Sequence, residues 1–196
     1  MIAYMTLSWH ELVTAATDSA TALLEKSEGD WSRPAGTLEW SCQQTVSHLS
    51  QAVTGYAGLL IAQPKDRYIT LMTHIDAGAP ADAKAEGIRI AGRMLAGVVR
   101  ETSPEARAWH PWGTSDVAGF SAMAVTELLL HSRDIALTFG LDWEPSDELC
   151  APVLERIFPG APTGHGAAET LLWSTGRGDL PGLERPAGWR WYGDVR

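Results

Sequence analysis

Apolar residues recur at intervals of three and four along most of this 196-residue chain, which is the spacing of amphipathic helices. Residues 41–62 show the pattern well, because one face of that segment carries Val46, Leu49, Val53, Tyr56 and Leu60. Alternating patterns with a period of two are too short to demand a sheet, although short pairings in the C-terminal tail stay open. The pattern predicts an all-α protein.

Local signals define the ends of the predicted helices. Ser8 and Glu11 have the spacing of a capping box, as do Ser41 and Gln44, and Gly140 is expected just after the fourth helix as its C′ residue. The predicted long helices cover residues 8–28, 41–62, 82–101 and 117–139, and two shorter ones cover 147–158 and 165–174. The connection 64–80 has room for a short helical turn.

Four long helices joined by both short and long connections are typical of a four-helix bundle. We expect this bundle to occupy residues 1–142 and to carry the functional site. Residues 143–196 are expected to form a short helical and irregular C-terminal extension that packs on the bundle.

Charge and hydropathy argue against two kinds of partner. The net charge is −9, from 15 Lys and Arg against 24 Asp and Glu, and no basic cluster offers the footprint that nucleic acid needs. No apolar run approaches the roughly 20 residues of a membrane helix. The N-terminal residues lack the basic region and long apolar stretch of a signal peptide, so a cytoplasmic protein is expected, in which Cys42 and Cys150 would not form a disulfide.

The nine tryptophans are a high count for this length. Trp109 and Trp112 fall in a predicted loop, and Trp189 and Trp191 fall in the tail, where such side chains can wall a pocket as well as fill a core. A homodimer is compatible with the apolar content, but no interface is visible in the sequence.

The predicted fourth helix carries the most informative side chains. Its apolar stripe Phe120, Ala124, Leu128 and Ile135 also contains Glu127 and His131, which are four residues apart and therefore one turn apart on the same face. A buried carboxylate or imidazole costs several kcal/mol unless it is paired or coordinated. The two residues therefore form either an intrahelical ion pair or two ligands of a common metal ion.

His48 is the third candidate ligand. It lies about two turns into the predicted second helix and shares a face with Ala52, Tyr56 and Leu59. Taken alone, a histidine at such a position is more often a satisfied or half-exposed helix residue than a metal ligand. Two histidines and one glutamate are the ligands of several catalytic zinc sites, in which a fourth position stays open for water or substrate.

At these residues the sequence resembles the mycothiol-dependent maleylpyruvate isomerase family of actinobacteria, within the DinB/YfiT-like superfamily of metal-binding four-helix bundles. The matching segments are E-W-S-C-Q-Q-T-V-S-H-L-S-Q-A around His48, V-T-E-L-L-L-H-S-R-D-I-A-L-T-F-G around Glu127 and His131, and L-L-W-S-T-G-R-G, which contains Arg177. The resemblance covers most of the chain. It implies a DinB-like bundle in which His48, Glu127 and His131 bind a divalent ion, in most members zinc.

The resemblance also points to Asp134 and Arg177 as residues of the site. Asp134 looks like the family's Asp of H-x-x-D, which can orient a ligand imidazole or pair with a neighbouring arginine. Arg177 matches a late arginine that family members place near the metal pocket, which implies a catalytic and cofactor-binding role. Capping the C-terminus of the preceding helix is the alternative role for Arg177.

The expected function follows from this resemblance. It implies an enzyme, a transferase or isomerase that uses mycothiol or a similar low-molecular-weight thiol together with a small electrophilic substrate. The maleylpyruvate isomerases carry a longer C-terminal domain than residues 141–196 here, so the metal site is implied more firmly than the substrate. The alternatives are a metal-dependent hydrolase or cyclase without a thiol, and a non-catalytic metal-binding or ligand-binding bundle. Among the other histidines, His10, His74, His110 and His165 are all available as acid or base groups.

Overall fold

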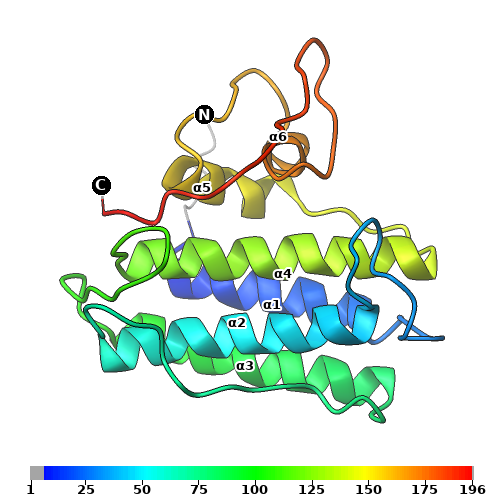
Figure 1. Cartoon of the computed structure of the whole chain (residues 1–196), viewed down its shortest axis with the longest axis horizontal. Coiled ribbons are helices and arrows are strands. Elements are labelled where there is room, and N and C mark those ends of the chain that lie inside the picture. Colours follow the sequence, from blue (N-terminus) through cyan, green and yellow to red (C-terminus); the bar gives the residue numbers. More distant parts are fainter. Residues whose placement is uncertain (1–6, 196) are drawn as a thin grey trace.

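The computed structural model describes residues 7–195, and in that range it contains six α-helices and no β-strand (Figure 1). The predicted all-α class is therefore confirmed. The helices are α1 (Trp9–Leu24), α2 (Cys42–Ala62), α3 (Ala81–Glu101), α4 (Val117–Phe139), α5 (Asp147–Ile157) and α6 (Ala167–Ser174). The short pairings left open for the tail amount to one isolated bridge between Leu180 and Leu183.

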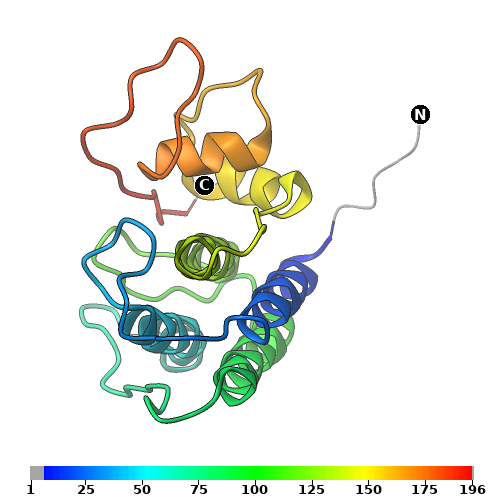
Figure 2. The same ribbon diagram turned by 90° about the vertical axis from the view of Figure 1, so that its right-hand side faces the viewer.

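The four long helices pack as a bundle. Helix α1 lies against α3 and α4, and α2 lies against the same two helices, so α1 and α2 occupy opposite corners (Figure 2). Because α1 and α2 are consecutive in the chain but not neighbours in space, the connection between them must cross the end of the bundle. The connection between α3 and α4 crosses the opposite end of the bundle (Figure 1), and both crossings bring loop residues over the faces of α2 and α4.

The predicted caps are confirmed. In α2 the Ser41 hydroxyl accepts from the backbone N–H of Gln44 at 3.1 Å, and the Gln44 side chain accepts from the N–H of Ser41 at 2.9 Å. In α1 the Ser8 N–H donates to Glu11 Oε2 at 2.8 Å. Gly140 follows α4 with φ of +66°, a left-handed conformation that glycine adopts without strain.

Several predicted helix ends were wrong by a few residues. Helix α1 ends at Leu24 instead of residue 28, because the N–H groups of Lys26 and Ser27 bond the carbonyls three residues back and Ser27 Oγ donates to the Leu23 carbonyl. Helix α6 begins at Ala167 instead of residue 165, since Gly164 has φ of +87° and Gly166 is extended. The connection 64–80 contains no helix, and its one hydrogen-bonded turn is closed by the Ala79 N–H, which donates to the Asp76 carbonyl at 3.2 Å.

The C-terminal part packs along α4. Helix α5 lies against α4, and α6 lies against α5. The tail then returns to the bundle, where the Gly193 carbonyl accepts from Ser115 Oγ at 2.6 Å, and Tyr192 N donates to the Ile157 carbonyl at the end of α5 at 2.8 Å. Residues far apart in the chain are thus held over one end of α4. The division into a bundle (residues 1–142) and a C-terminal extension (residues 143–196) stays a prediction.

The sequence led us to expect neither a disulfide nor a membrane-spanning helix. Cys42 and Cys150 are both buried and free of any disulfide. Within residues 7–195, no helix combines the length and the apolar character that a bilayer crossing requires.

Candidate metal centre

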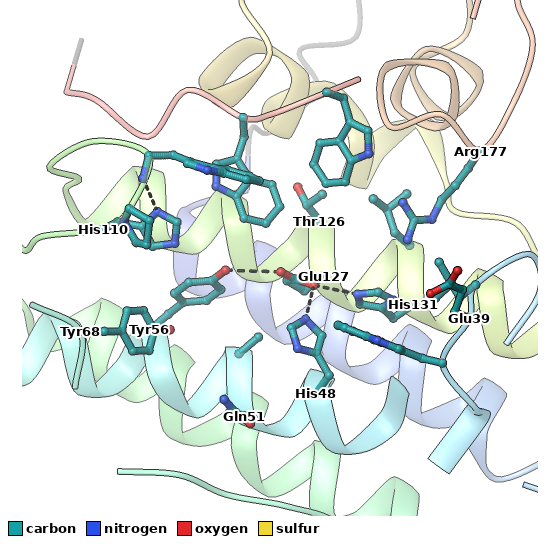
Figure 3. A pocket seen from close by; sticks show the side chains of 18 residues that line it. Glu39, His48, Gln51, Tyr56, Tyr68, His110, Thr126, Glu127, His131 and Arg177 are labelled. Atoms are coloured by element: carbon teal, nitrogen blue, oxygen red, sulfur yellow. Dashed lines mark hydrogen bonds and ion pairs between the residues drawn. The ribbon is translucent and has the colours of Figure 1, made fainter. Parts of the chain in front are cut away.

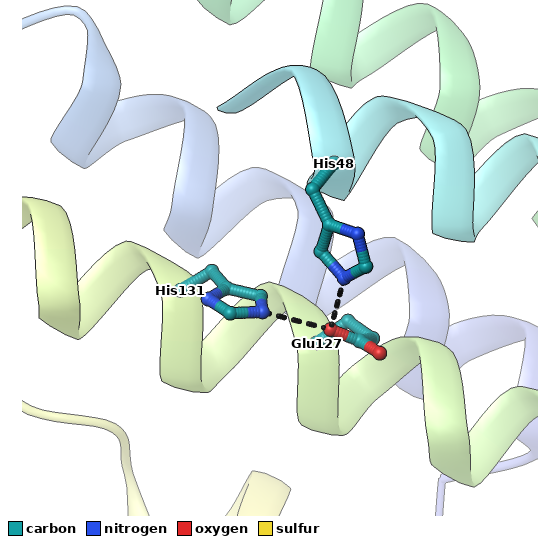
Figure 4. Close-up of side chains that lie close together, drawn as sticks. All are labelled: His48, Glu127 and His131. Atoms are coloured by element: carbon teal, nitrogen blue, oxygen red, sulfur yellow. Dashed lines mark ion pairs between the residues drawn. The ribbon is translucent and has the colours of Figure 1, made fainter. Parts of the chain in front are cut away.

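The three predicted ligands meet between α2 and α4 (Figure 4). Glu127 Oε2 lies 3.0 Å from His131 Nε2, one turn along α4, and 3.4 Å from His48 Nε2, which reaches across from α2. One atom from each side chain falls within 4.8 Å of the other two. Glu127 and His131 are 8% and 7% exposed, whereas His48 is half-buried.

These distances suit a metal ion. Bonds of about 2.0–2.1 Å and tetrahedral angles place the donor atoms of a zinc site roughly 3.3 Å apart, close to the 3.0 and 3.4 Å found here. An ion pair between Glu127 and protonated imidazoles would use the same atoms. The ion pair and the metal site therefore differ in protonation and charge more than in the placement of the side chains. The triad could hold a divalent ion without rearrangement of its side chains.

The electrostatic surroundings favour charge on both α4 residues. Burial alone would raise the pKa of Glu127, but its hydrogen bonds to His131 and His48 outweigh that effect and hold the pKa well below the usual range. Burial alone would lower the pKa of His131, but hydrogen bonds to Asp134 and Glu127 raise it to about 9. The carboxylate of Glu127 is consequently ready to act as a metal ligand at neutral pH.

Asp134 makes both of the contacts that the sequence left as alternatives. Its Oδ2 lies 3.2 Å from His131 Nδ1, so it orients the imidazole whose other nitrogen faces Glu127. It also accepts from Arg177, with Nη2 to Oδ2 at 2.9 Å and Nε to Oδ1 at 3.1 Å. These hydrogen bonds lower the pKa of Asp134 against the opposing effect of burial.

Arg177 makes contacts that relate to both of its suggested roles, capping the end of α6 and lining the pocket beside the triad. Its Nη1 is 3.4 Å from the Thr175 carbonyl beyond the end of α6, so a contact to the helix end exists, although the pair with Asp134 is closer. The same side chain borders the cavity above the triad (Figure 3). The structure thus brings Arg177 to the site, and its catalytic and cofactor-binding role stays a prediction.

The triad forms the floor of a cavity of about 630 Å³ (Figure 3). This volume is within the usual range for small-molecule sites. Trp40 covers the ligands, with its ring centroid 4.9 Å from that of His48 and 6.4 Å from that of His131. The aromatic walls are formed by Trp40, Tyr56, Tyr68, Trp112, Trp189 and Trp191.

The sequence predicted some of the aromatic residues that line the cavity and did not predict others. Trp112, Trp189 and Trp191 line the cavity as the loop and tail positions suggested, whereas Trp109 does not. Tyr56 was assigned only to the apolar stripe, but its hydroxyl lies 3.5 Å from Glu127 Oε1. Burial and the neighbouring carboxylate raise the pKa of Tyr56 well above its usual value, so the hydroxyl keeps its proton.

Of the four histidines that the sequence left as candidate acid or base groups, only His110 lines this cavity. His74 and His165 are exposed, and His10 lies beside Ser8 at the start of α1. His110 belongs to the connection between α3 and α4, and nothing local in the sequence shows that this connection folds over the triad.

The fold and the site together define a class of protein, an all-α bundle with a candidate metal centre of two histidines and one glutamate at the floor of a cavity. The sequence model of the mycothiol maleylpyruvate isomerase N-terminal domain matches residues 12–136, which is more than half of the chain. The chain belongs to this family, as its resemblance indicated. Neither the curated proteins nor the solved structures yield a match.

Proposed function

We propose that the protein is a cytoplasmic metal-dependent enzyme that uses mycothiol or a similar low-molecular-weight thiol. The thiol would be transferred to a small electrophilic substrate or would catalyse its isomerisation. The observation that carries this proposal is the convergence of His48, Glu127 and His131 at the floor of a cavity of about 630 Å³. Membership of a family named after a mycothiol-dependent isomerase supports it.

The residues of the triad fit a divalent ion, zinc in this proposal. Two imidazoles and one carboxylate would provide three ligands and leave the fourth position of a tetrahedral ion free, a donor set that is typical of catalytic rather than structural zinc sites. When bound, the ion would supply the positive charge that favours a thiolate over a thiol at neutral pH. Asp134 holds His131 in the orientation that turns Nε2 to the site.

The chain's other residues would bind and orient the two reactants. The aromatic walls would shield the reactants above the triad from part of the surrounding water, and Arg177 presents a guanidinium at one border of the cavity. Arg177 would contact polar groups of the thiol or of the substrate, with its position set by Asp134. For isomerisation the sulfur adds to one carbon of a C=C bond, rotation follows about the resulting single bond, and the same sulfur leaves, so no net oxidation occurs.

The test is thiol consumption in the presence of electrophiles, measured with the purified protein before and after removal of metal and again after zinc is restored. We expect turnover that needs both thiol and metal, that is lost in His48→Ala and that is retained in the control His165→Ala. A zinc-loaded protein with neither thiol-dependent turnover nor thiol binding would rule the proposal out.

A second candidate is a hydrolase or cyclase without a thiol. The same two-histidine, one-glutamate donor set serves zinc peptidases, in which the ion activates water. Turnover without any added thiol would favour this function. A protein that binds metal but turns over neither kind of substrate would be a non-catalytic binding bundle.

A further inference from the structure

His110 lines the same cavity as the metal triad but is not one of its three residues. It belongs to the connection between α3 and α4, and Figure 3 shows it with Tyr56 and Tyr68 on one side of Glu127, with Arg177 on the other. The His110 ring centroid lies 6.2 Å from that of Tyr56 and 6.3 Å from that of Tyr68. Glu127 is near enough for its charge to act on the imidazole. His110 and the triad therefore border one shared space.

A hydrogen bond determines which ring nitrogen of His110 carries the proton. The backbone N–H of Trp112 donates to His110 Nδ1 at 3.3 Å, so Nδ1 acts as an acceptor and the proton of the neutral ring belongs on Nε2. Burial lowers the pKa of His110 to about 4, against a smaller opposing effect of Glu127, and the ring is therefore neutral at physiological pH. His110 is consequently a neutral hydrogen-bond donor at Nε2 and a weak base.

The Nε2–H group of His110 is free to bond a molecule in the cavity. Within residues 7–195, Nε2 has no hydrogen-bond partner, yet it is not one of the polar atoms that packing seals from solvent. Other donors of the cavity walls already have acceptors in the protein. Thr126 Oγ1 donates to the Ala122 carbonyl at 2.8 Å, and Arg177 Nη2 donates to Asp134 at 2.9 Å. His110 thus offers a donor that the fold itself does not use.

The proposed thiol chemistry needs such a donor. When the sulfur electron pair forms a bond to one carbon of a C=C bond that is conjugated to a carbonyl, the displaced π electrons move onto the carbonyl oxygen, which becomes negative. Return of those electrons expels the sulfur again. Because the free position of the ion is assigned to the sulfur, the oxygen has to be stabilised elsewhere. A donor that is fixed before the reaction stabilises such an oxygen effectively, and a neutral imidazole does so without giving up its proton.

We propose that His110 is a catalytic residue of this site, whose Nε2–H donates to the substrate oxygen that becomes negative as the sulfur bonds to carbon. The assignment rests on the proposed function, because it takes the cavity as the place where thiol and electrophile meet. The sulfur would lie over the triad, and the oxygen would lie at the end of the cavity beside Tyr56 and Tyr68. No proton moves to or from His110 during the reaction.

The first test establishes the state of the imidazole in the purified protein. In nitrogen-15 NMR spectra at pH 7, the ring signals that are missing from His110→Phe should be those of a neutral imidazole with its proton on Nε2. A proton on Nδ1 with Nε2 bare would overturn the proposal, because no donor would then face the substrate. A charged ring would overturn it as well, because His110 would then be a general acid.

The second test detects the hydrogen bond itself with 4-phenyl-2-butanone, a ketone that has no C=C bond for the sulfur to attack. We expect the infrared carbonyl band of the bound ketone to lie at lower wavenumber in the parent than in His110→Phe at equal metal content. His110→Gln keeps an N–H donor and should restore part of the shift, and the exposed control His165→Phe should match the parent. An equal band in parent and His110→Phe, a shift that is lost in Tyr68→Phe instead, or no binding of the ketone would overturn the proposal.

Turnover with mycothiol separates this inference from the proposed function. His110→Phe should lower kcat/KM for 4-phenyl-3-buten-2-one by on the order of 100-fold, the usual cost of losing one donor to a developing oxyanion. The loss should be far smaller with benzyl chloride, which releases chloride and places no charge on an oxygen. If the ketone band shifts as expected but no electrophile consumes thiol, the proposed function fails and the hydrogen bond stands. If thiol is consumed but His110→Phe affects both electrophiles equally or neither, the proposed function stands and the role of His110 fails.

Discussion

Arg177 of the C-terminal segment donates through Nε and Nη2 to the carboxylate of Asp134 in α4, at 3.1 and 2.9 Å. The same carboxylate lies 3.2 Å from His131 Nδ1. A chain of contacts thus joins the segment after α6 to a metal-ligand candidate in the bundle. The placement of the imidazole consequently depends on residues from both parts of the chain.

Replacing Asp134 tests this chain of contacts. Asp134→Asn removes the charge that orients His131 and should weaken zinc binding by about 10–100-fold, the usual effect of losing a carboxylate behind a ligand histidine. Competition with a chromogenic chelator measures the affinity. Glu144→Gln, which alters the partner of Arg133 in an ion pair between α4 and the loop that follows it, should leave the affinity unchanged.

Replacing Arg177 separates stability from function. Arg177→Gln leaves the Asp134 carboxylate buried with a weaker partner, and we expect a loss of about 3 kcal/mol in the free energy of unfolding. Arg177→Lys keeps the charge but loses the two-point contact, so it should be the more stable of the two variants. If Arg177 contacts the reactants, Arg177→Lys should also raise the KM for thiol; an unchanged KM would restrict Arg177 to a positioning role.

Metal content tests the ligand set directly. The protein should bind one divalent ion per chain, and His48→Ala should lose it, because the remaining two ligands come from a single turn of α4. Elemental analysis of purified protein gives the stoichiometry, with His165→Ala as the exposed control. Full metal content in His48→Ala would remove His48 from the set.

The neutral state of His110 predicts a pH effect on stability. Its pKa is about 4 in the folded protein, below the usual value near 6.5, so the unfolded chain binds the proton more readily. The contribution of His110 to stability is therefore complete above pH 6.5 and declines as the pH falls toward 4. Urea unfolding of His110→Asn beside the parent should show a smaller loss of stability between pH 6.5 and 4.

Lys84 gives a prediction outside the site. This lysine is 1% exposed, and its Nζ donates to the carbonyls of Asp76, Ala77 and Ala79 at 3.1, 3.1 and 2.6 Å. Lys84→Met leaves these carbonyls without their donor and should lower the free energy of unfolding by about 2–4 kcal/mol. The exposed Lys26→Met should change it by less than about 0.5 kcal/mol.

The sequence by itself determined the helices and the pair of candidate ligands in α4. Apolar spacing, capping residues and Gly140 are local signals, and each reflects a property of the chain over a few residues. Glu127 and His131 share a face for the same reason, since a separation of four residues in a helix is a fixed geometry. Helical spacing made His48 a third candidate, but its assignment to the same site came from resemblance to a family, because no local rule relates α2 to α4.

Only the tertiary structure decided what surrounds the ligands. The crossing of the bundle by its long connections brings Trp40 and His110 over the triad, and the return of the tail brings Trp191 to the same cavity. The contact of Arg177 with Asp134 spans 43 positions in the chain. Such contacts depend on the packing of whole helices and on loop paths, which set the distance between side chains that sequence spacing leaves undetermined.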